Sequence, residues 1–174
     1  ELSDIDDQSM DEDGVFTYGL VATDVDDTDL SYSATVDGHA SIDVTGSTLT
    51  ITPDLNYNGE IAVNVIVSDG ELTDSGSFIL TVSPINNPPI LTFIPNQNID
   101  EDGVFTYELV ATDVDDTELS YNATVNGNAS VDVIGSTLTI TPDLNYNGDI
   151  TVDVTVSDDG GLTDSGSFTL RVNP

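Results

Sequence analysis

The sequence predicts an all-β protein made of two tandem β-sandwiches, and three observations carry this prediction. Residues 11 to 69 align with residues 100 to 158 at a constant offset of 89, and only eleven of the fifty-nine aligned positions differ. Apolar and polar residues alternate along several short segments, which is typical of half-buried strands. No segment shows the period of an amphipathic helix. About seven short strands in each unit therefore favour a sandwich.

The clearest strand is predicted over 61–67, where four apolar residues, Ile61, Val63, Val65 and Val67, occupy alternate positions. The second copy keeps these apolar positions and changes the intervening ones to Thr151, Asp153 and Thr155. Substitution at the outward-facing positions alone is expected of a strand with one buried face. Further strands are expected over 15–21, 30–36, 40–44, 47–53 and 76–82, with glycines marking the turns between them.

We expect a first domain with its linker over residues 1–89 and a second domain over residues 90–174. The join at 83–103 holds Pro84, Pro88, Pro89 and Pro95, which favour a short, stiff, extended connector. One extra residue enters the second copy at 157–161, within a predicted turn. Both ends of the chain align with the edges of linkers, so we expect a longer array of such units.

The chain carries 33 acidic residues, no lysine and a single arginine, Arg171, for a formal net charge of -32. Such a field disfavours nucleic acid and direct contact with an anionic membrane, because both are bound through Lys and Arg. The hydrophobic content of 37% indicates a folded protein rather than an acidic tail. Since the protein has almost no positive charges of its own, bound cations are predicted to reduce the repulsion among the carboxylates.

Acidic residues recur at three places in each unit: before the first strand, in the loop after it, and in the turn before the last strand. Clustered carboxylates are the hard oxygen ligands that Ca²⁺ prefers. A transition metal fits less well, because there is no cysteine and His39 becomes Asn128 in the second copy. The positions are Glu12, Asp24, Asp26 and Asp69 in the first unit and Glu101, Asp113, Asp115 and Asp158 in the second.

Two further features leave alternatives open. The segment "DLNYNG" at 54–59 begins like an EF-hand loop, but its twelfth position is Val65, where a bidentate Glu is required. It is interpreted as a turn or as a contributor to a cation site. Tyr57 is interpreted as a tyrosine corner, as a ligand platform or as plain packing.

Together, the acidic Glu before the first strand, the "ATDxDD" loop, "PDLNYNG" and "VSD" resemble the bacterial cadherin-like repeats of surface adhesins and multimodular polysaccharide-degrading proteins. The resemblance covers nearly the whole of both units and implies immunoglobulin-like Greek-key sandwiches with Ca²⁺ shared at the domain joints. It implies ligands from Glu12, from Asn86 of the linker, and from Asp113, Asp115 and Asp158. Asp24, Asp26 and Asp69, with Asp4 or Asp6 as helpers, would face a preceding domain.

The linker departs from the cadherin pattern "DxNDN", because "PINNP" has Pro84 and Asn87 in the places of the two aspartates. Fewer anionic ligands predict weaker or fewer ions at each joint.

The leading hypothesis is a non-enzymatic, extracellular or cell-surface adhesion or spacer module stiffened by Ca²⁺, with neighbouring repeats or another copy of the array as partners. The alternative is a Ca²⁺-dependent polysaccharide-binding module that presents Tyr18, Tyr32 or Tyr57. Catalysis is disfavoured, because duplicated, solvated carboxylate clusters do not provide an acid with a raised pKa in a cleft. With one histidine and no cysteine, a Ser/His/Asp or Cys/His arrangement is not expected.

Overall fold

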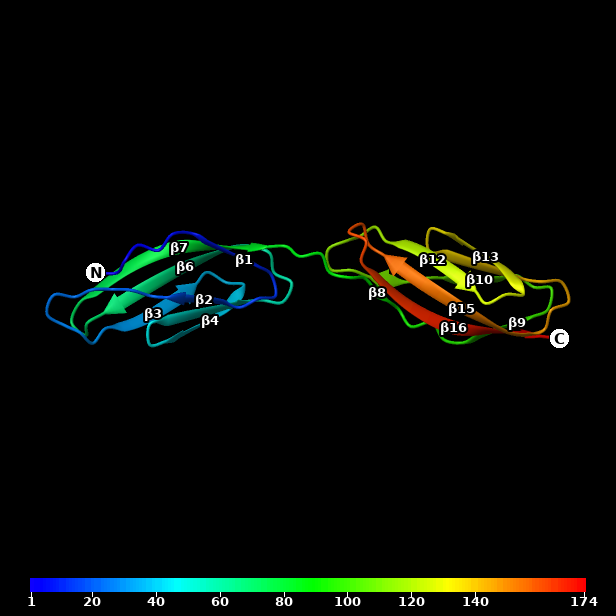
Figure 1. Ribbon diagram of the computed structural model, residues 1–174, viewed down its shortest axis with the longest axis horizontal. Coiled ribbons are helices and arrows are strands. Elements are labelled where there is room, and N and C mark those ends of the chain that lie inside the picture. The colour runs from blue at the N-terminus through cyan, green and yellow to red at the C-terminus, as the bar shows by residue number, and fades with distance from the viewer. The chain divides into compact units, whose positions relative to one another are not determined.

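A computed structural model describes residues 1–174 as two compact units, Glu1–Ile85 and Asn86–Pro174, and each is a sandwich of two β-sheets (Figure 1). The first unit has a four-stranded sheet in the order β1-β7-β6-β3 and a three-stranded sheet in the order β2-β5-β4. Its strands are β1 (Gln8–Asp11), β2 (Phe16–Gly19), β3 (Ser31–Val36), β4 (Ala40–Thr45), β5 (Thr48–Pro53), β6 (Gly59–Ser68) and β7 (Thr73–Ser83).

The second unit repeats this plan with sheets β12-β15-β16-β9 and β10-β14-β13. A short pair, β8 with β11, is added where the first unit has a single bridge between Leu2 and Ala22. The strands are β8 (Ile90–Leu91), β9 (Gln97–Asp100), β10 (Phe105–Glu108), β11 (Ala111–Thr112), β12 (Ser120–Val125), β13 (Ala129–Ile134), β14 (Thr137–Pro142), β15 (Gly148–Ser157) and β16 (Thr163–Asn173).

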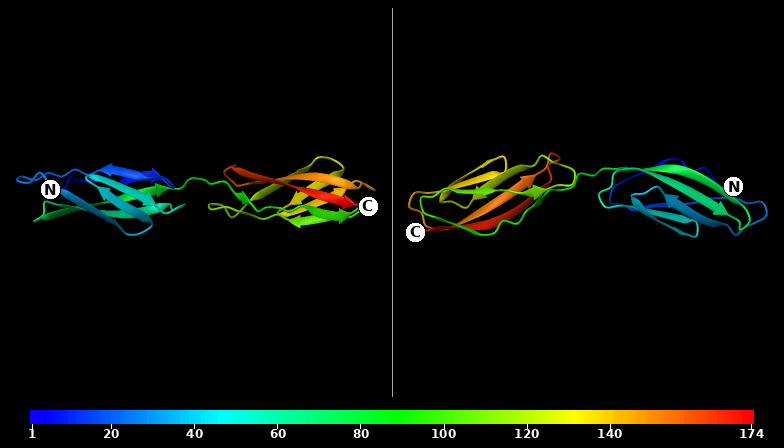
Figure 2. Two further views of the ribbon diagram at one scale, coloured as in Figure 1. Left: turned by 90° about the horizontal axis from the view of Figure 1, so that it is seen from below. Right: turned by 180° about the vertical axis from the view of Figure 1, so that it is seen from behind.

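The core of each unit lies between its two sheets (Figure 2). In the first unit Leu49 and Ile51 of β5 and Ile61, Val63 and Val65 of β6 are at most 1% exposed. The intervening residues of β6 are exposed. The alternation read from the sequence is therefore confirmed, and β15 repeats it in the second unit.

The hairpin between β4 and β5 shows how a local residue choice fixes the register. Thr45 pairs with Thr48, so only Gly46 and Ser47 form the loop. Gly46 has a φ of 61° and Ser47 is not among the residues with positive φ, which suits a turn with glycine at its first central position. Gly135 adopts the same φ in the second unit.

The predicted all-β class and the two tandem sandwiches are confirmed, but the first strand of each sandwich, β1 or β9, was missed, and so was the short pair of β8 with β11. β1 and β9 pair in parallel with the last strand of their own unit. In β1 only Gln8 and Met10 turn toward partly buried positions. Two such residues in four give no recognisable hydrophobic period.

One face of β6 is buried and the other is exposed, so substitutions on the two faces are expected to have very different effects on stability. Ile61→Ala should lower the free energy of unfolding of the first unit by about 2–5 kcal/mol, since it leaves a cavity in the core. Ile66→Thr, which installs the residue of the second unit at an exposed position, should change it by less than about 0.5 kcal/mol. Urea unfolding followed by circular dichroism measures both, and equal losses would contradict the assigned buried face.

Candidate metal centre

The "ATDxDD" loop of each unit is organised by its first aspartate. Asp113 Oδ1 accepts the backbone N–H groups of Asp115 at 2.8 Å and Asp116 at 3.0 Å. Asp24 Oδ1 does the same for Asp26 and Asp27 in the first unit, at 3.0 Å each. Such side-chain-to-backbone bonds are why aspartate favours turns. One carboxylate oxygen is thus used by the loop, and the other is left to point elsewhere.

The turn before the last strand is built in the same way. Asp158 Oδ1 accepts the N–H of Leu162 at 2.7 Å, while Asp69 Oδ1 accepts those of Glu71 and Leu72 at 2.7 Å. The bonds from Leu72 and then Glu71 hold the pKa of Asp69 below its usual value. Asp158 is only 7% exposed, which is exceptional for a carboxylate in this chain.

In the second unit, two linker residues donate hydrogen bonds to the aspartates of the loop and the turn. Asn86 Nδ2 donates to Asp158 Oδ2 at 2.9 Å, and the backbone N–H of Asn87 donates to Asp115 Oδ2 at 2.8 Å. Gly160 makes room for this contact, because a Cβ at that position would lie 2.5 Å from Asn86 Nδ2. The sequence-predicted residues Asn86, Asp113, Asp115 and Asp158 are therefore all brought to the same end of the unit.

The carboxylates of Asp113, Asp116 and Asp158 converge, since one oxygen from each lies within 4.8 Å of the others. Asp113 Oδ2 and Asp116 Oδ2 are shut off from solvent and have no hydrogen-bond partner. Burial, followed by the neighbouring carboxylate of Asp159, raises the pKa of Asp116. Convergent oxygens without donors fit a hard cation such as Ca²⁺, because unpaired buried charge is otherwise costly.

No basic side chain neutralises this cluster. Arg171 forms an exposed ion pair with Asp149 at 3.1 Å, so the one arginine is engaged elsewhere. Asp116 was not among the residues predicted from the sequence. Its spacing could not have identified it, because the equivalent residue Asp27 donates its N–H to Asp24 in the same way and stays exposed.

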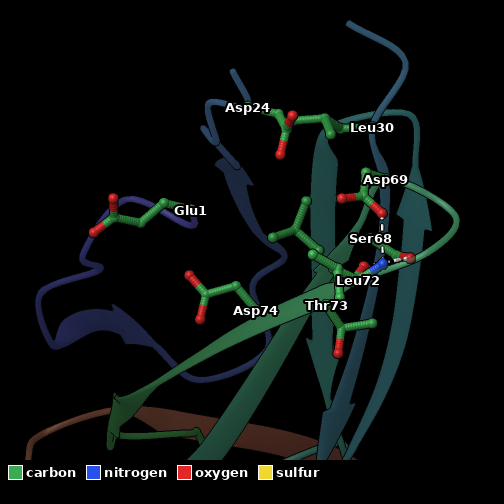
Figure 3. Close-up of a pocket in the computed structure, with 9 residues that line it drawn as sticks. Glu1, Asp24, Leu30, Ser68, Asp69, Leu72, Thr73 and Asp74 are labelled. Atoms are coloured by element: carbon green, nitrogen blue, oxygen red, sulfur yellow. Dashed lines mark hydrogen bonds between the residues drawn. The ribbon is translucent and has the colours of Figure 1, made fainter. Parts of the chain in front are cut away.

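The first unit gathers its acidic residues more loosely. Asp24, Asp26 and Asp27 have oxygens within 4.8 Å of one another, but Asp26 and Asp27 are exposed. Asp24 and Asp69 line a hollow of about 290 Å³, and Figure 3 shows their side chains together with Glu1 and Asp74 around it. The backbone N–H groups of Asp26 and Asp27 hold the pKa of Asp24 below its usual value.

Glu12 lies at the other end of the first unit. The β7 strand separates it from Asp69 by about 33 Å, since Asp69 precedes β7 and Glu12 donates its N–H to Ser83 at the strand's end. Its side chain is 2% exposed, and each oxygen accepts a hydrogen bond: Oε1 from the N–H of Ile85 at 2.9 Å and Oε2 from Asn58 Nδ2 at 3.2 Å. Glu12 thus holds the last residue of its unit.

The tyrosines proposed for sugar stacking have structural contacts. Tyr18 and Tyr32 pack against the core. Tyr57 also packs there, its hydroxyl donates to the carbonyl oxygen of Glu60 at 3.0 Å, and His39 stacks on its ring at 4.5 Å. The hydroxyl bond resembles that of a tyrosine corner but runs to a later residue instead of an earlier one. Phe93, by contrast, is an aromatic side chain that is 81% exposed.

The fold is that of cadherin ectodomains. The human protocadherin-24 EC1-2 structure matches with a TM-score of 0.57 at 16% identity, covering 90% of this chain and 87% of that one. Protocadherin gamma B2 extracellular cadherin domains 3-6 match with a TM-score of 0.60 at 16% identity, covering 99% of this chain and 46% of that one. Protocadherin gamma B7 domains 1-4 give 0.53 at 18% identity, with 97% and 49% covered. The predicted cadherin-like resemblance is confirmed at the level of the fold.

The bacterial Ig domain family matches residues 2–81 and again residues 86–171. Because these two matches cover nearly the whole sequence, the chain belongs to this family and contains two tandem copies of its domain. No curated protein matches the sequence.

Asp74 provides a pH-dependent test of the backbone-anchoring carboxylates. The N–H groups of Leu2, at 2.8 Å, and Ser75 hold the pKa of Asp74 below its usual value. A folded-state pKa below the unfolded one stabilises the unit above the unfolded pKa, and this contribution is lost as the pH falls through the folded pKa. Asp74→Ala should therefore destabilise the first unit at pH 7, and the difference from the parent should shrink as the pH falls through the lowered pKa of Asp74.

Urea unfolding of both proteins across this pH range measures the effect. Asp4→Ala, at an exposed position, is the control for loss of one negative charge. A loss of stability in Asp74→Ala that is the same at every pH would contradict the anchoring role of the carboxylate.

Proposed function

We propose that this chain is a non-enzymatic, extracellular adhesion or spacer module whose domain joints are stiffened by Ca²⁺. Two tandem cadherin-like sandwiches of the bacterial Ig domain family support an adhesion or spacer role. No helix in the structure has the length and apolar character needed to cross a membrane. The observation that carries the Ca²⁺ part is the pair of buried, unpartnered oxygens on Asp113 and Asp116.

The path of the chain supports a role for the cation in stiffening. Glu12 holds the N–H of Ile85, and the next residue, Asn86, donates to Asp158. Consecutive linker residues are therefore bound to carboxylates of different units. An ion on Asp113, Asp115 and Asp158, with Glu12 and Asn86 as further ligands, would restrict the backbone freedom of the linker. In the first unit, Asp24, Asp26 and Asp69 are proposed to serve a preceding repeat in the same way.

Polysaccharide binding remains the second candidate. Stacking through Tyr18, Tyr32 or Tyr57 has little support, because these rings pack against the core or lie under His39. The exposed ring of Phe93 is the feature that favours it. Glycan-array binding measured in Ca²⁺ and in chelator, with Phe93→Ala as the variant, distinguishes this candidate from a pure spacer.

Ca²⁺ should stabilise the fold, because a ligand that binds only the native state adds RT ln(1 + [L]/Kd), or about 2.7 kcal/mol at a hundredfold excess over Kd. A thermal scan at matched ionic strength should show a higher Tm in millimolar Ca²⁺ than in chelator. Mg²⁺ at the same concentration is the control, since it tolerates irregular geometry less well. An identical Tm in Ca²⁺ and chelator would refute the cation site.

Asp113→Ala combined with Asp115→Ala should loosen the joint while leaving both sandwiches folded, because the cores consist of apolar strand residues. Small-angle scattering in Ca²⁺ should show greater flexibility than in the parent, and the far-ultraviolet circular dichroism should be unchanged. Asp43→Ala with Asp132→Ala, on exposed positions of β4 and β13, controls for charge removal. Scattering identical to that of the parent would exclude a stiffening role for these two aspartates.

A further inference from the structure

We infer that the second unit binds a neutral oligosaccharide along the outer side of β16. The ring of Phe93 stacks on one sugar, and polar groups around Arg171 form hydrogen bonds with the next. This inference rests on the second candidate function, polysaccharide binding, and assigns to it a site and a class of glycan. All the residues involved belong to the second unit, and none belongs to the acidic loop or the turn before β16.

Two hollows follow each other along β16. The first, of about 210 Å³, is lined by residues 91–94 and 165–167. The second, of about 370 Å³, is lined by residues 96–98, Asp149, Thr169 and Arg171. Ser167 of the first and Thr169 of the second are two residues apart on one face of the strand, which corresponds to about 7 Å. One short glycan can therefore reach both hollows.

The first hollow is apolar on one side and hydroxylated on the other. Phe93 is 81% exposed, and the hydroxyl-bearing residues Thr92, Ser165 and Ser167 line the same hollow. None of its lining residues is charged, although the chain has 33 acidic residues. A sugar ring also has an apolar face edged by hydroxyl groups. An exposed aromatic face beside neutral hydroxyls matches it, because such sites combine apolar contact with a few polar groups.

The edge of β16 leaves room for a small ligand but not for an added strand. Thr169 donates its backbone N–H to Asn96 Oδ1 at 2.9 Å, and Leu91 donates its N–H to Asp164 Oδ2 at 2.8 Å. Between these two contacts Ser167 directs its N–H to the same side as Thr169, and β9 pairs with β16 only from Leu170 onward. One open position suits a sugar hydroxyl, whereas a peptide strand needs several in succession.

The second hollow supplies both donors and acceptors. Asn98 lies next to Arg171 across the ladder of β9 and β16, and Asp149 lies opposite Arg171 on β15. The side chains of the Arg171–Asp149 ion pair are 66% and 57% exposed, so the guanidinium keeps free donors and the carboxylate keeps free lone pairs. Sugar hydroxyls donate and accept at once, and this mixture of amide, guanidinium and carboxylate can satisfy them.

The first unit lacks this surface. Residues 1–9 align with residues 90–98 and differ at six of nine positions, against eleven of fifty-nine between 11–69 and 100–158. The three identical positions in the second unit, Leu91, Ile94 and Gln97, are those that turn inward. At outward positions, four acidic residues of the first unit are replaced by neutral ones: Glu1, Asp4, Asp6 and Asp7 become Ile90, Phe93, Pro95 and Asn96. The fold is kept while the surface is changed.

The charge of the chain selects the class of glycan. A glycan that carries carboxylate or sulfate groups is repelled by a protein with a net charge of -32, and a second copy of this chain is repelled in the same way. A neutral glycan experiences no such repulsion. The loss of four negative charges beside the two hollows does not create a positive surface, since Arg171 remains paired with Asp149.

The test uses the full 174-residue chain in chelator, so that a bound cation cannot contribute. Cellohexaose, mannohexaose and xylohexaose are titrated by calorimetry and by residue-resolved NMR. At least one should bind and shift resonances within 91–98 and 165–171. Phe93→Ala should weaken this binding about threefold to tenfold, because an aromatic stacking contact is lost. Arg171→Thr, which installs the residue of the first unit, should weaken it as well.

Leu55→Ala is the matched control, since Leu55 is an equally exposed apolar side chain in the first unit, and it should leave the affinity unchanged. A uronic acid hexasaccharide that binds more tightly than every neutral one would overturn the assigned class of glycan. Sedimentation of the glycan-free chain tests a different occupant: if Phe93→Ala abolishes self-association of the parent, a second copy covers the ring and the inference is wrong.

The site and the candidate function fail in different ways. If a neutral glycan binds with the same affinity to the parent, Phe93→Ala and Arg171→Thr, polysaccharide binding stands and the site on β16 is wrong. If no glycan binds in either Ca²⁺ or chelator, the site and polysaccharide binding both fail. The adhesion or spacer role, which scattering tests, is unaffected by either result.

Discussion

Uncompensated negative charge is the constraint on which the rest of this structure depends. With 33 acidic residues and one arginine, ion pairs within the protein can satisfy almost none of the carboxylates. Backbone N–H groups take their place: Asp7 accepts Ile79, Asp37 accepts Ala62, and Asp164 accepts Leu91. Carboxylates thus connect strands and turns through neutral donors. Asp113 Oδ2 and Asp116 Oδ2 are buried and receive no hydrogen bond, so these two atoms are suited to bind a cation.

The two units have nearly the same sequence, yet their acidic clusters differ in burial. Their cores and hairpins coincide, and most differences lie on exposed positions such as Ile66 and Thr155. The exception is the turn that contains Asp158 and the extra residue. There the linker residue Asn86 reaches the carboxylate beside Gly160, and an exposed acidic loop becomes a partly buried one.

Much of the fold could be predicted from the sequence, because buried strands such as β6 alternate residue by residue and the repeat doubles the evidence. The missed strand β1 is a contrast: its partners in the parallel strand β7 are seventy-two residues away, and two inward side chains leave no hydrophobic period. The gathering of Asn86, Asp113, Asp115 and Asp158 followed from motif resemblance. The inward turn of Asp116 did not, because it depends on the loop's hydrogen bonds and on the neighbouring turn, which sequence patterns do not specify.

The parallel pairing of β1 with β7 has a mechanical consequence for an array of such units. The chain enters each sandwich ahead of β1 and leaves it after β7, and Gln8 pairs with Leu80 while Asp11 pairs with Ser83. Tension along the chain therefore pulls these two strands past each other along their length. All the hydrogen bonds of the ladder bear the load together instead of opening one after another. Each unit is built to resist stretching at the strands where the force arrives.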